Sequence, residues 1–154
     1  MNKGVYIASN DAESGKSILA IGLTNALLRH KPKVGYFRPV IDDTLSDKKD
    51  NHINTILSYF SLDMDYEDAY GCSMTQLMKQ WNNNKKEAIL ETIITKYKNL
   101  EEKFDFVVVE GSDFSHFSSI IELDLNILIA KNLSIPVIII SGASNKAANT
   151  FLDS

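Results

Sequence analysis

Residues 5–17 read Val5-Tyr6-Ile7-Ala8-Ser9-Asn10-Asp11-Ala12-Glu13-Ser14-Gly15-Lys16-Ser17 and join a short apolar run to the start of a helical pattern. The apolar run has no polar alternation, which is typical of a strand buried on both faces of a parallel sheet. From Ser17 to His30 apolar residues recur at helical spacing, and Pro32 ends the pattern. A buried strand followed directly by a helix is the first unit of an α/β fold.

The same alternation of short apolar runs and helical patterns continues along the chain. It predicts four strands, near residues 4–8, 34–38, 106–110 and 137–141. It predicts further helices from residue 53 to about 61, from a capping Ser73 to the break at 82–84, over 88–100, from a capping Asp124 to Leu133, and from a capping Ser144 onward. Residues 42–51 are polar and aperiodic and predict a mobile loop. We expect a three-layer α/β domain with a mainly parallel sheet flanked by helices.

Length and composition exclude several classes of protein. The 154 residues are 44% hydrophobic and 23% charged, which fits one globular domain and neither a disordered nor a collagen-like chain. The net charge is −4 and no stretch concentrates Lys and Arg, so a nucleic-acid partner is not expected. Apolar runs are too short for a signal peptide or a membrane span. We expect a cytoplasmic protein without a nucleic-acid or membrane partner.

Residues 9–17 carry the chemistry of a phosphate-binding loop. Gly15 would let the backbone approach a phosphate, Lys16 would reach its β and γ oxygens, and the Ser17 hydroxyl would bind magnesium. The loop would open a helix whose N-terminus favours an anion. The P-loop pattern G-x-x-x-x-G-K-[ST] has a glycine where this chain has Asn10. We expect phosphate or nucleotide binding by Asn10, Asp11, Ala12, Glu13, Ser14, Gly15, Lys16 and Ser17, the alternative being an ordinary strand-to-helix turn.

Three charged residues are expected to face the same crevice, because the carboxyl ends of parallel strands meet at one edge of a sheet. Glu110 would bind magnesium or orient a water molecule, unless it is an N-cap or a solvated strand end. Asp11 would be another magnesium ligand, unless it bonds its own backbone. Arg38 would contact a phosphate or an anionic substrate, unless it is a surface cation. Mg²⁺, held by Ser17, Glu110 and Asp11, and ATP or another nucleotide are the cofactors that this set implies.

The histidines and the cysteine are not expected to take part in catalysis. His30, His52 and His116 follow no ligand spacing along the chain. Cys72 cannot form an intramolecular disulfide and lacks a paired histidine motif, as is typical of a small buried residue. The sequence therefore predicts no catalytic residue.

Two stretches are far more specific than Gly-Lys-Ser: Glu110-Gly111-Ser112-Asp113-Phe114 and Ile129-Ala130-Lys131-Asn132-Leu133. Together with residues 5–17, 33–39, 66–71 and 124–126, they resemble the N-terminal domain of the long form of phosphate acetyltransferase, which is itself similar to dethiobiotin synthetase. The resemblance covers nearly the whole chain and implies a P-loop fold.

The resemblance also implies a function. Such enzymes exchange the acetyl group of acetyl-CoA with phosphate, giving acetyl phosphate and CoA, and their acyl-transfer site lies in a separate C-terminal domain. The domain seen here would be a regulatory and assembly module. Its implied partners are a nucleotide or small metabolite effector, a C-terminal acetyltransferase domain or chain, and further copies in a homo-oligomer. The resembled domain continues beyond its fourth strand, so we expect residues 1–154 to be one P-loop NTPase-like domain truncated at its C-terminal end.

Two other functions stay open at this point. One is an ATP-dependent ligase like dethiobiotin synthetase, with Lys16 and Ser17 on Mg-ATP, Asp11 and Glu110 on the metal, and Arg38 near the substrate. That family has a lysine where this chain has Arg38 and usually a glycine where it has Ser9, and a planar guanidinium does not replace a compact ammonium. The other is a scaffold whose loop binds no nucleotide.

Overall fold

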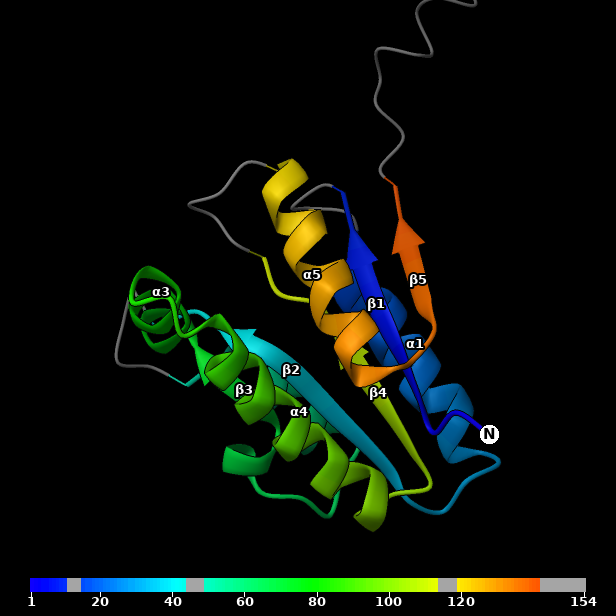
Figure 1. Cartoon of the computed structure of the whole chain (residues 1–154). Helices are drawn as coiled ribbons and strands as arrows, with labels where there is room; N and C mark the ends of the chain where they lie inside the picture. Colours follow the sequence, from blue (N-terminus) through cyan, green and yellow to red (C-terminus); the bar gives the residue numbers. More distant parts are fainter. Residues whose placement is uncertain (11–14, 44–48, 114–118, 142–154) are drawn as a thin grey trace, which may run out of the picture.

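A five-stranded sheet lies between two layers of helices in the computed structural model, which describes residues 1–10, 15–43, 49–113 and 119–141 (Figure 1). The strands are β1 (Gly4–Ser9), β2 (Val34–Ile41), β3 (Tyr70–Ser73), β4 (Phe106–Glu110) and β5 (Val137–Ile140). Their order is β3-β2-β4-β1-β5, and every neighbouring pair is parallel. The predicted α/β class is confirmed.

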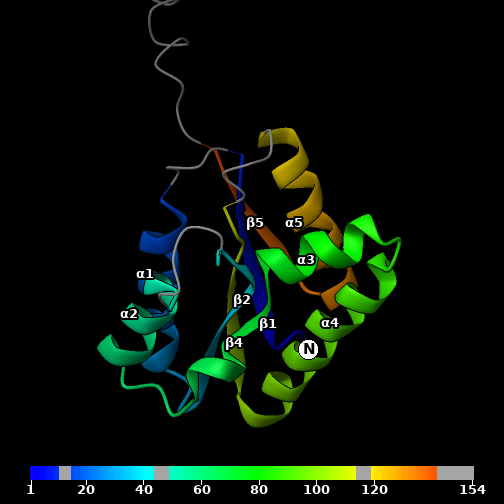
Figure 2. The ribbon, with the colours of Figure 1, turned by 90° about the vertical axis from the view of Figure 1, so that its left-hand side faces the viewer.

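The helices form two separate layers. They are α1 (Lys16–Leu28), α2 (Asn51–Tyr59), α3 (Met74–Asn82), α4 (Lys86–Lys103) and α5 (Ser119–Leu133), with a short 3-10 turn η1 (Tyr66–Asp68). Figure 2 shows α1 and α2 on one side of the sheet and α3, α4 and α5 on the other. In the described part of the chain, no helix is long and apolar enough to cross a membrane.

The central strands bring the carboxyl ends of β1 and β4 together. The register pairs Tyr6 with Val109 and Ile7 with Glu110, so the residues that follow each strand leave the sheet at the same edge. All six residues of β1 are buried, as are Val107 to Glu110 of β4. Apolar residues on both sides of these strands bury them between the two helix layers. Polar groups that follow these two strands therefore gather where the strands end.

β3 is the strand that the apolar pattern did not predict. Its four residues, Tyr-Gly-Cys-Ser, contain no β-branched run, and the strand pairs only with β2, at the edge of the sheet. β2 also runs through Pro39 to Ile41, although Pro39 was expected to end it. The proline is tolerated because the last residue of β2 that pairs with β4 is Phe37, so its missing N–H leaves no gap in that ladder.

Several helix boundaries differ from the predicted ones. α1 stops at Leu28 rather than at His30. α2 begins earlier than expected, because the Asp50 side chain accepts hydrogen bonds from the backbone N–H groups of His52 and Ile53 and caps the helix. The predicted cap at Asp124 is wrong, since α5 begins at Ser119 and Asp124 lies exposed within it. Residues 44–48 of the predicted loop and the helix predicted after Ser144 lie outside the described residues.

Ser73, in contrast, caps α3 as predicted. Its hydroxyl accepts from the Gln76 backbone N–H, and the Gln76 side chain accepts from the Ser73 backbone N–H, which makes a complete capping box. Cys72 is buried, and this burial raises the pKa of its thiol to about 12. It is the small buried residue that the sequence indicates.

Gly111 allows the chain to leave β4 in close contact with β1. A Cβ atom at this position would lie 2.8 Å from the Ile7 carbonyl oxygen and 2.7 Å from Asn126 Oδ1. We expect Gly111→Ala to lower the free energy of unfolding by about 1–3 kcal/mol, because backbone and a buried amide must move apart. Urea denaturation of the chain measures this change.

Gly22→Ala is the matched control for this substitution. Gly22 lies on the exposed side of α1, where a Cβ would meet nothing within 4 Å. Alanine favours a helix over glycine, so this variant is expected to gain about 0.5–1 kcal/mol of stability. Unfolding of Gly111→Ala at the wild-type urea concentration would contradict the close approach at β4.

Candidate functional site

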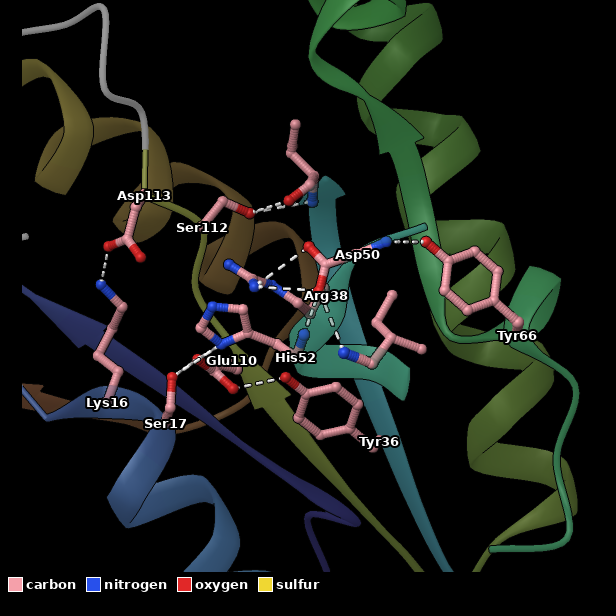
Figure 3. Close-up of polar contacts among 12 residues, drawn as sticks. Lys16, Ser17, Tyr36, Arg38, Asp50, His52, Tyr66, Glu110, Ser112 and Asp113 are labelled. Carbon is pink, nitrogen blue, oxygen red and sulfur yellow. Dashed lines mark hydrogen bonds and ion pairs between the residues drawn. The ribbon is translucent and has the colours of Figure 1, made fainter. Parts of the chain in front are cut away.

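Lys16 lies at the start of α1 and is buried despite its charge. Gly15 precedes it with φ 85° and ψ 18°, a left-handed conformation that a residue without a Cβ adopts at little cost. The Lys16 side chain is 4% exposed. Its Nζ donates to Ser9 Oγ at 2.8 Å. The same atom forms an ion pair with Asp113 (Figure 3). The ammonium group is thus held between the end of β1 and the loop that follows β4.

Ser17, His52 and Glu110 meet beside this lysine. The Ser17 hydroxyl donates to Glu110 Oε1 at 2.8 Å. His52 Nδ1 lies 2.8 Å from Ser17 Oγ and 3.2 Å from Glu110 Oε1. The other carboxylate oxygen of Glu110, Oε2, accepts a hydrogen bond of 2.5 Å from the Tyr36 hydroxyl. Side chains from α1, α2 and β2 therefore converge on the carboxylate that β4 carries (Figure 3).

The Glu110 carboxylate stays ionised although it is 1% exposed. Burial alone would raise its pKa. Hydrogen bonds from His52, Tyr36 and Ser17 and the nearby charge of Arg38 outweigh burial and lower this pKa from 4.5 to about 2. The same contact has the opposite effect on its partner: burial and the Glu110 charge raise the pKa of the Tyr36 hydroxyl well above 10. Tyr36 therefore remains a neutral donor and Glu110 a charged acceptor.

Arg38 and Asp50 form a second buried pair at the edge of the crevice. Arg38 is 4% exposed, so it is not a surface cation. One of its terminal nitrogens, Nη1, lies 3.3 Å from Asp50 Oδ2. Burial would lower the pKa of the guanidinium, but the charges of neighbouring acidic groups raise it overall. Asp50 also caps α2, so this pair ties the helix that carries His52 to β2.

A buried polar network fixes the loop that carries Asp113. Asn126 of α5 accepts from the Tyr6 hydroxyl at 2.6 Å and from the Ser112 backbone N–H at 3.2 Å, and its amide donates to the Ser112 carbonyl. The Ser112 hydroxyl donates to the Val40 carbonyl and accepts from the Val40 N–H. Residues from β1, β2 and α5 thereby hold the segment between Glu110 and Asp113 in place.

A cavity of about 240 Å³ opens next to the three converging side chains. It is lined by Ser17, Ile21, Asn51, His52, Thr55, Ile56 and Glu110. Two of these side chains, Ile21 of α1 and Ile56 of α2, are apolar, and the other five carry polar groups. A small polar ligand or a hydrated cation can reach Ser17, His52 and Glu110 from this cavity.

The structure brings together most of the described site residues that the sequence predicted, whereas Asn10 has other partners. Gly15, Lys16, Ser17, Arg38 and Glu110 do meet at the carboxyl edge of the sheet. Asn10 binds to the end of β5, where its N–H donates to the Ile140 carbonyl and its amide to the Ser141 hydroxyl. Asp11, Ala12, Glu13 and Ser14 lie outside the described residues, so their predicted role in binding stays a prediction.

Four residues of the site were not predicted: Tyr36, Asp50, His52 and Asp113. His52 was set aside because its spacing from other ligand types has no pattern, yet it reaches a serine 35 positions and a glutamate 58 positions away in the chain. Asp50 fits a helix N-cap signal, being followed by an apolar helical pattern. Tyr36 lies in the middle of a predicted strand and Asp113 three residues after another. Both belong to stretches that carry the family resemblance, but that resemblance predicted no contact for either side chain.

The oxygen atoms of Ser17 and Glu110 fit two adjacent positions around a magnesium ion, since they lie 2.8 Å apart and Mg²⁺ prefers oxygen ligands. Among the described residues, no group of three or more His, Cys, Asp or Glu side chains could hold a metal ion. Most remaining positions around Mg²⁺ would belong to water or to phosphate oxygens, as is usual for this ion.

Comparison with known proteins relates the chain to one family model and to two kinds of enzyme. The family model AAA_26, described as an AAA domain, matches residues 3–153. The chain is 39% identical to a phosphate acetyltransferase of Nitratidesulfovibrio vulgaris and 33% identical to one of Synechocystis sp., in each case over 100% of this chain and 22% of the relative. It is 24% identical to an ATP-dependent dethiobiotin synthetase of Clostridium perfringens, over 97% of this chain and 69% of that protein.

The matched segment is the N-terminal part of the phosphate acetyltransferases. The chain spans 22% of the length of these relatives. The resemblance inferred from the Glu-Gly-Ser-Asp-Phe stretch is thereby confirmed.

The low pKa of Glu110 makes stability depend on pH. A carboxyl with a pKa of about 2 in the folded protein and 4.5 in the unfolded chain stabilises the fold above pH 4.5, by ~3 kcal/mol. This stabilisation is lost as the pH falls from 4.5 towards 2. Glu110→Gln keeps the size of the side chain but removes the charge, so it is expected to lower the free energy of unfolding at pH 7 by about 2–4 kcal/mol.

Urea unfolding at a series of pH values from 7 to 3 tests this. The Glu110→Gln variant is expected to lose less stability than wild type over the acid part of the series. Glu102→Gln, at an exposed position of α4, is the control and is expected to follow wild type. Parallel pH curves for wild type and Glu110→Gln would contradict a stabilising Glu110 carboxylate.

Proposed function

The chain belongs to the AAA_26 family of AAA domains, and from this membership we propose that it is the N-terminal regulatory and assembly domain of a phosphate acetyltransferase. The observation that carries the proposal is the match of the entire chain to the N-terminal part of two such enzymes. In this function the complete protein exchanges the acetyl group of acetyl-CoA with phosphate. Acyl transfer occurs on a C-terminal acetyltransferase domain or chain, and residues 1–154 form one P-loop domain that carries no acyl-transfer site.

The crevice binds the phosphate groups of a nucleotide or of a small metabolite effector. Lys16 and the N-terminus of α1 supply positive charge at one point, which favours an anion. Ser17 and Glu110 hold Mg²⁺, which neutralises the phosphates. Arg38 contributes a second cation, and its buried Nε has no hydrogen-bond partner among the described residues. That open donor supports a contact with an anionic ligand.

Binding is weak, because the loop is degenerate. Asn10 replaces the first glycine of the P-loop pattern and is bonded to the end of β5. The Lys16 ammonium is already paired with Asp113, so an incoming phosphate has to compete with this carboxylate. The domain therefore senses a ligand at high concentration rather than retaining it tightly.

Two features bear on assembly and on the ligase alternative. β5 lies at an edge of the sheet and exposes 39% of Ile138 and 54% of Ile139, which favours coverage by another subunit in a homo-oligomer. Ligase chemistry has less support. Identity to the dethiobiotin synthetase is 24%, against 39% for the first phosphate acetyltransferase, and Arg38 is engaged with Asp50.

Calorimetric titration with Mg-ATP and Mg-GTP tests the loop. Wild type is expected to bind one of them with a Kd of about 1 mM. Lys16→Ala is expected to abolish the heat of binding, and Asp113→Asn to lower the Kd about fivefold, because a partly exposed competing ion pair of ~1 kcal/mol is removed. Lys79→Ala, at an exposed position of α3, is the control and keeps wild-type affinity.

The absence of binding heat in every protein at millimolar nucleotide would reject the nucleotide-binding function in favour of the scaffold. Circular dichroism of Lys16→Ala and Asp113→Asn checks that both variants fold. A Kd unchanged by Asp113→Asn would contradict competition between Asp113 and phosphate.

A direct assay tests the division of labour between this domain and acyl transfer. The purified chain, incubated with acetyl-CoA and phosphate, is expected to form acetyl phosphate no faster than the uncatalysed reaction. A complete phosphate acetyltransferase serves as the positive control. Formation of acetyl phosphate by the chain alone at an enzyme-like rate would overturn the regulatory and assembly function.

A further inference from the structure

Resting on the metal site that the proposed function gives to Ser17 and Glu110, we propose that the His52 imidazole completes this site as a nitrogen ligand and makes it prefer a divalent first-row transition cation, Mn²⁺ or Co²⁺. Three side chains from three different elements meet in one place (Figure 3), and all three line the cavity. Their donor atoms are Ser17 Oγ of α1, His52 Nδ1 of α2 and Glu110 Oε1 of β4. A nitrogen at this place changes which metal the site prefers.

The distances among the three atoms fit one face of an octahedron. Ser17 Oγ lies 2.8 Å from both Glu110 Oε1 and His52 Nδ1, and the third side of the triangle is 3.2 Å. A cation with bonds of about 2.1 Å places neighbouring octahedral donors about 3 Å apart. The triangle therefore accepts such a cation with little rearrangement and leaves the opposite face of the octahedron for water or phosphate oxygens.

Two of the three ligand residues, Glu110 and His52, are held by second contacts. The Tyr36 hydroxyl holds Glu110 Oε2, which leaves Oε1 directed at Ser17 and His52. Asp50 accepts from the His52 backbone N–H at 2.9 Å and caps the helix that carries the imidazole. Arg38 fixes Asp50 in turn. Supporting contacts of this kind are typical of metal sites, where they set the direction of the ligands.

The imidazole is accessible as well as oriented. The His52 side chain is 40% exposed, whereas that of Glu110 is 1% exposed, so the histidine lies on the open side of the cluster. Coordination uses the lone pair of Nδ1, so the ring proton then lies on Nε2, and the hydrogen bond between Nδ1 and Glu110 gives way to the cation. No bond other than metal coordination forms, and nothing is oxidised or reduced.

The nitrogen ligand decides the selectivity. Mg²⁺ is a hard cation that takes oxygen ligands, and imidazole adds little to its binding. Divalent first-row transition cations accept imidazole together with carboxylate, and Co²⁺ binds such donor sets more tightly than Mn²⁺. The site is thus expected to prefer Co²⁺ and Mn²⁺ over Mg²⁺, and binding requires no nucleotide.

Titration of the nucleotide-free chain with Co²⁺, Mn²⁺ and Mg²⁺, each alone, tests this by calorimetry, with the visible absorption of Co²⁺ as a second signal. Wild type is expected to bind Co²⁺ at least tenfold more tightly than Mg²⁺. His52→Gln is expected to weaken Co²⁺ binding at least tenfold and to change Mg²⁺ binding less than threefold. His30→Gln, at an exposed position after α1, is the matched control. Equal Co²⁺ affinity in wild type and His52→Gln overturns the proposal, as does equal affinity of wild type for Co²⁺ and Mg²⁺.

NMR of the wild-type chain provides a test without any substitution. Substoichiometric Mn²⁺ is expected to broaden the ring signals of His52 and to leave those of His30 sharp. Unbroadened His52 signals overturn the proposal. Because neither experiment contains a nucleotide, a failed nucleotide titration rejects the phosphate-binding function alone, and a failed metal titration rejects the cation site alone.

Discussion

The buried negative charge of Glu110 determines how the other residues of the crevice are arranged. A carboxylate that is 1% exposed at the end of β4 is stable only if donors and cations surround it. They come from three other elements: Tyr36 from β2, Ser17 from α1 and His52 from α2. Satisfying one charge therefore fixes how these elements sit against β4. Packing in the apolar cores on the two faces of the sheet does not by itself fix these positions, because apolar contacts are not directional.

Glu110 and Asp113 each bind one of two neighbouring residues, Ser17 and Lys16. Glu110 bonds Ser17, and Asp113 pairs with Lys16. The close approach of Gly111 to β1 and the polar network of Ser112 with Asn126 set the distance between the two carboxylates. One short segment after β4 therefore controls both the cation side and the anion side of the crevice. A change in its packing against α5 would move both together.

Sequence patterns predicted what depends on neighbours along the chain. The valine run of β4, the apolar run of β1 and the Ser73 cap each act over a few residues, so they could be recognised. β3 was not predicted, because an edge strand of Tyr-Gly-Cys-Ser depends on pairing with β2, about 30 residues earlier. His52 was not predicted as a site residue for the same reason, since the order of the strands brings its partners to it. The helix cap predicted at Asp124 was wrong, because an aspartate fits a cap and an exposed helix position equally well.

The charges of the crevice imply an order of binding. Lys16 and Arg38 face three carboxylates, those of Asp50, Glu110 and Asp113, which leaves one negative charge in excess. Such a cluster attracts a cation more readily than a phosphate. A divalent cation on Ser17, His52 and Glu110 would reverse the sign of the local charge and weaken the hold of Asp113 on Lys16 relative to a phosphate. The cation and the anion would then favour each other's binding, because each compensates the charge that opposes the other.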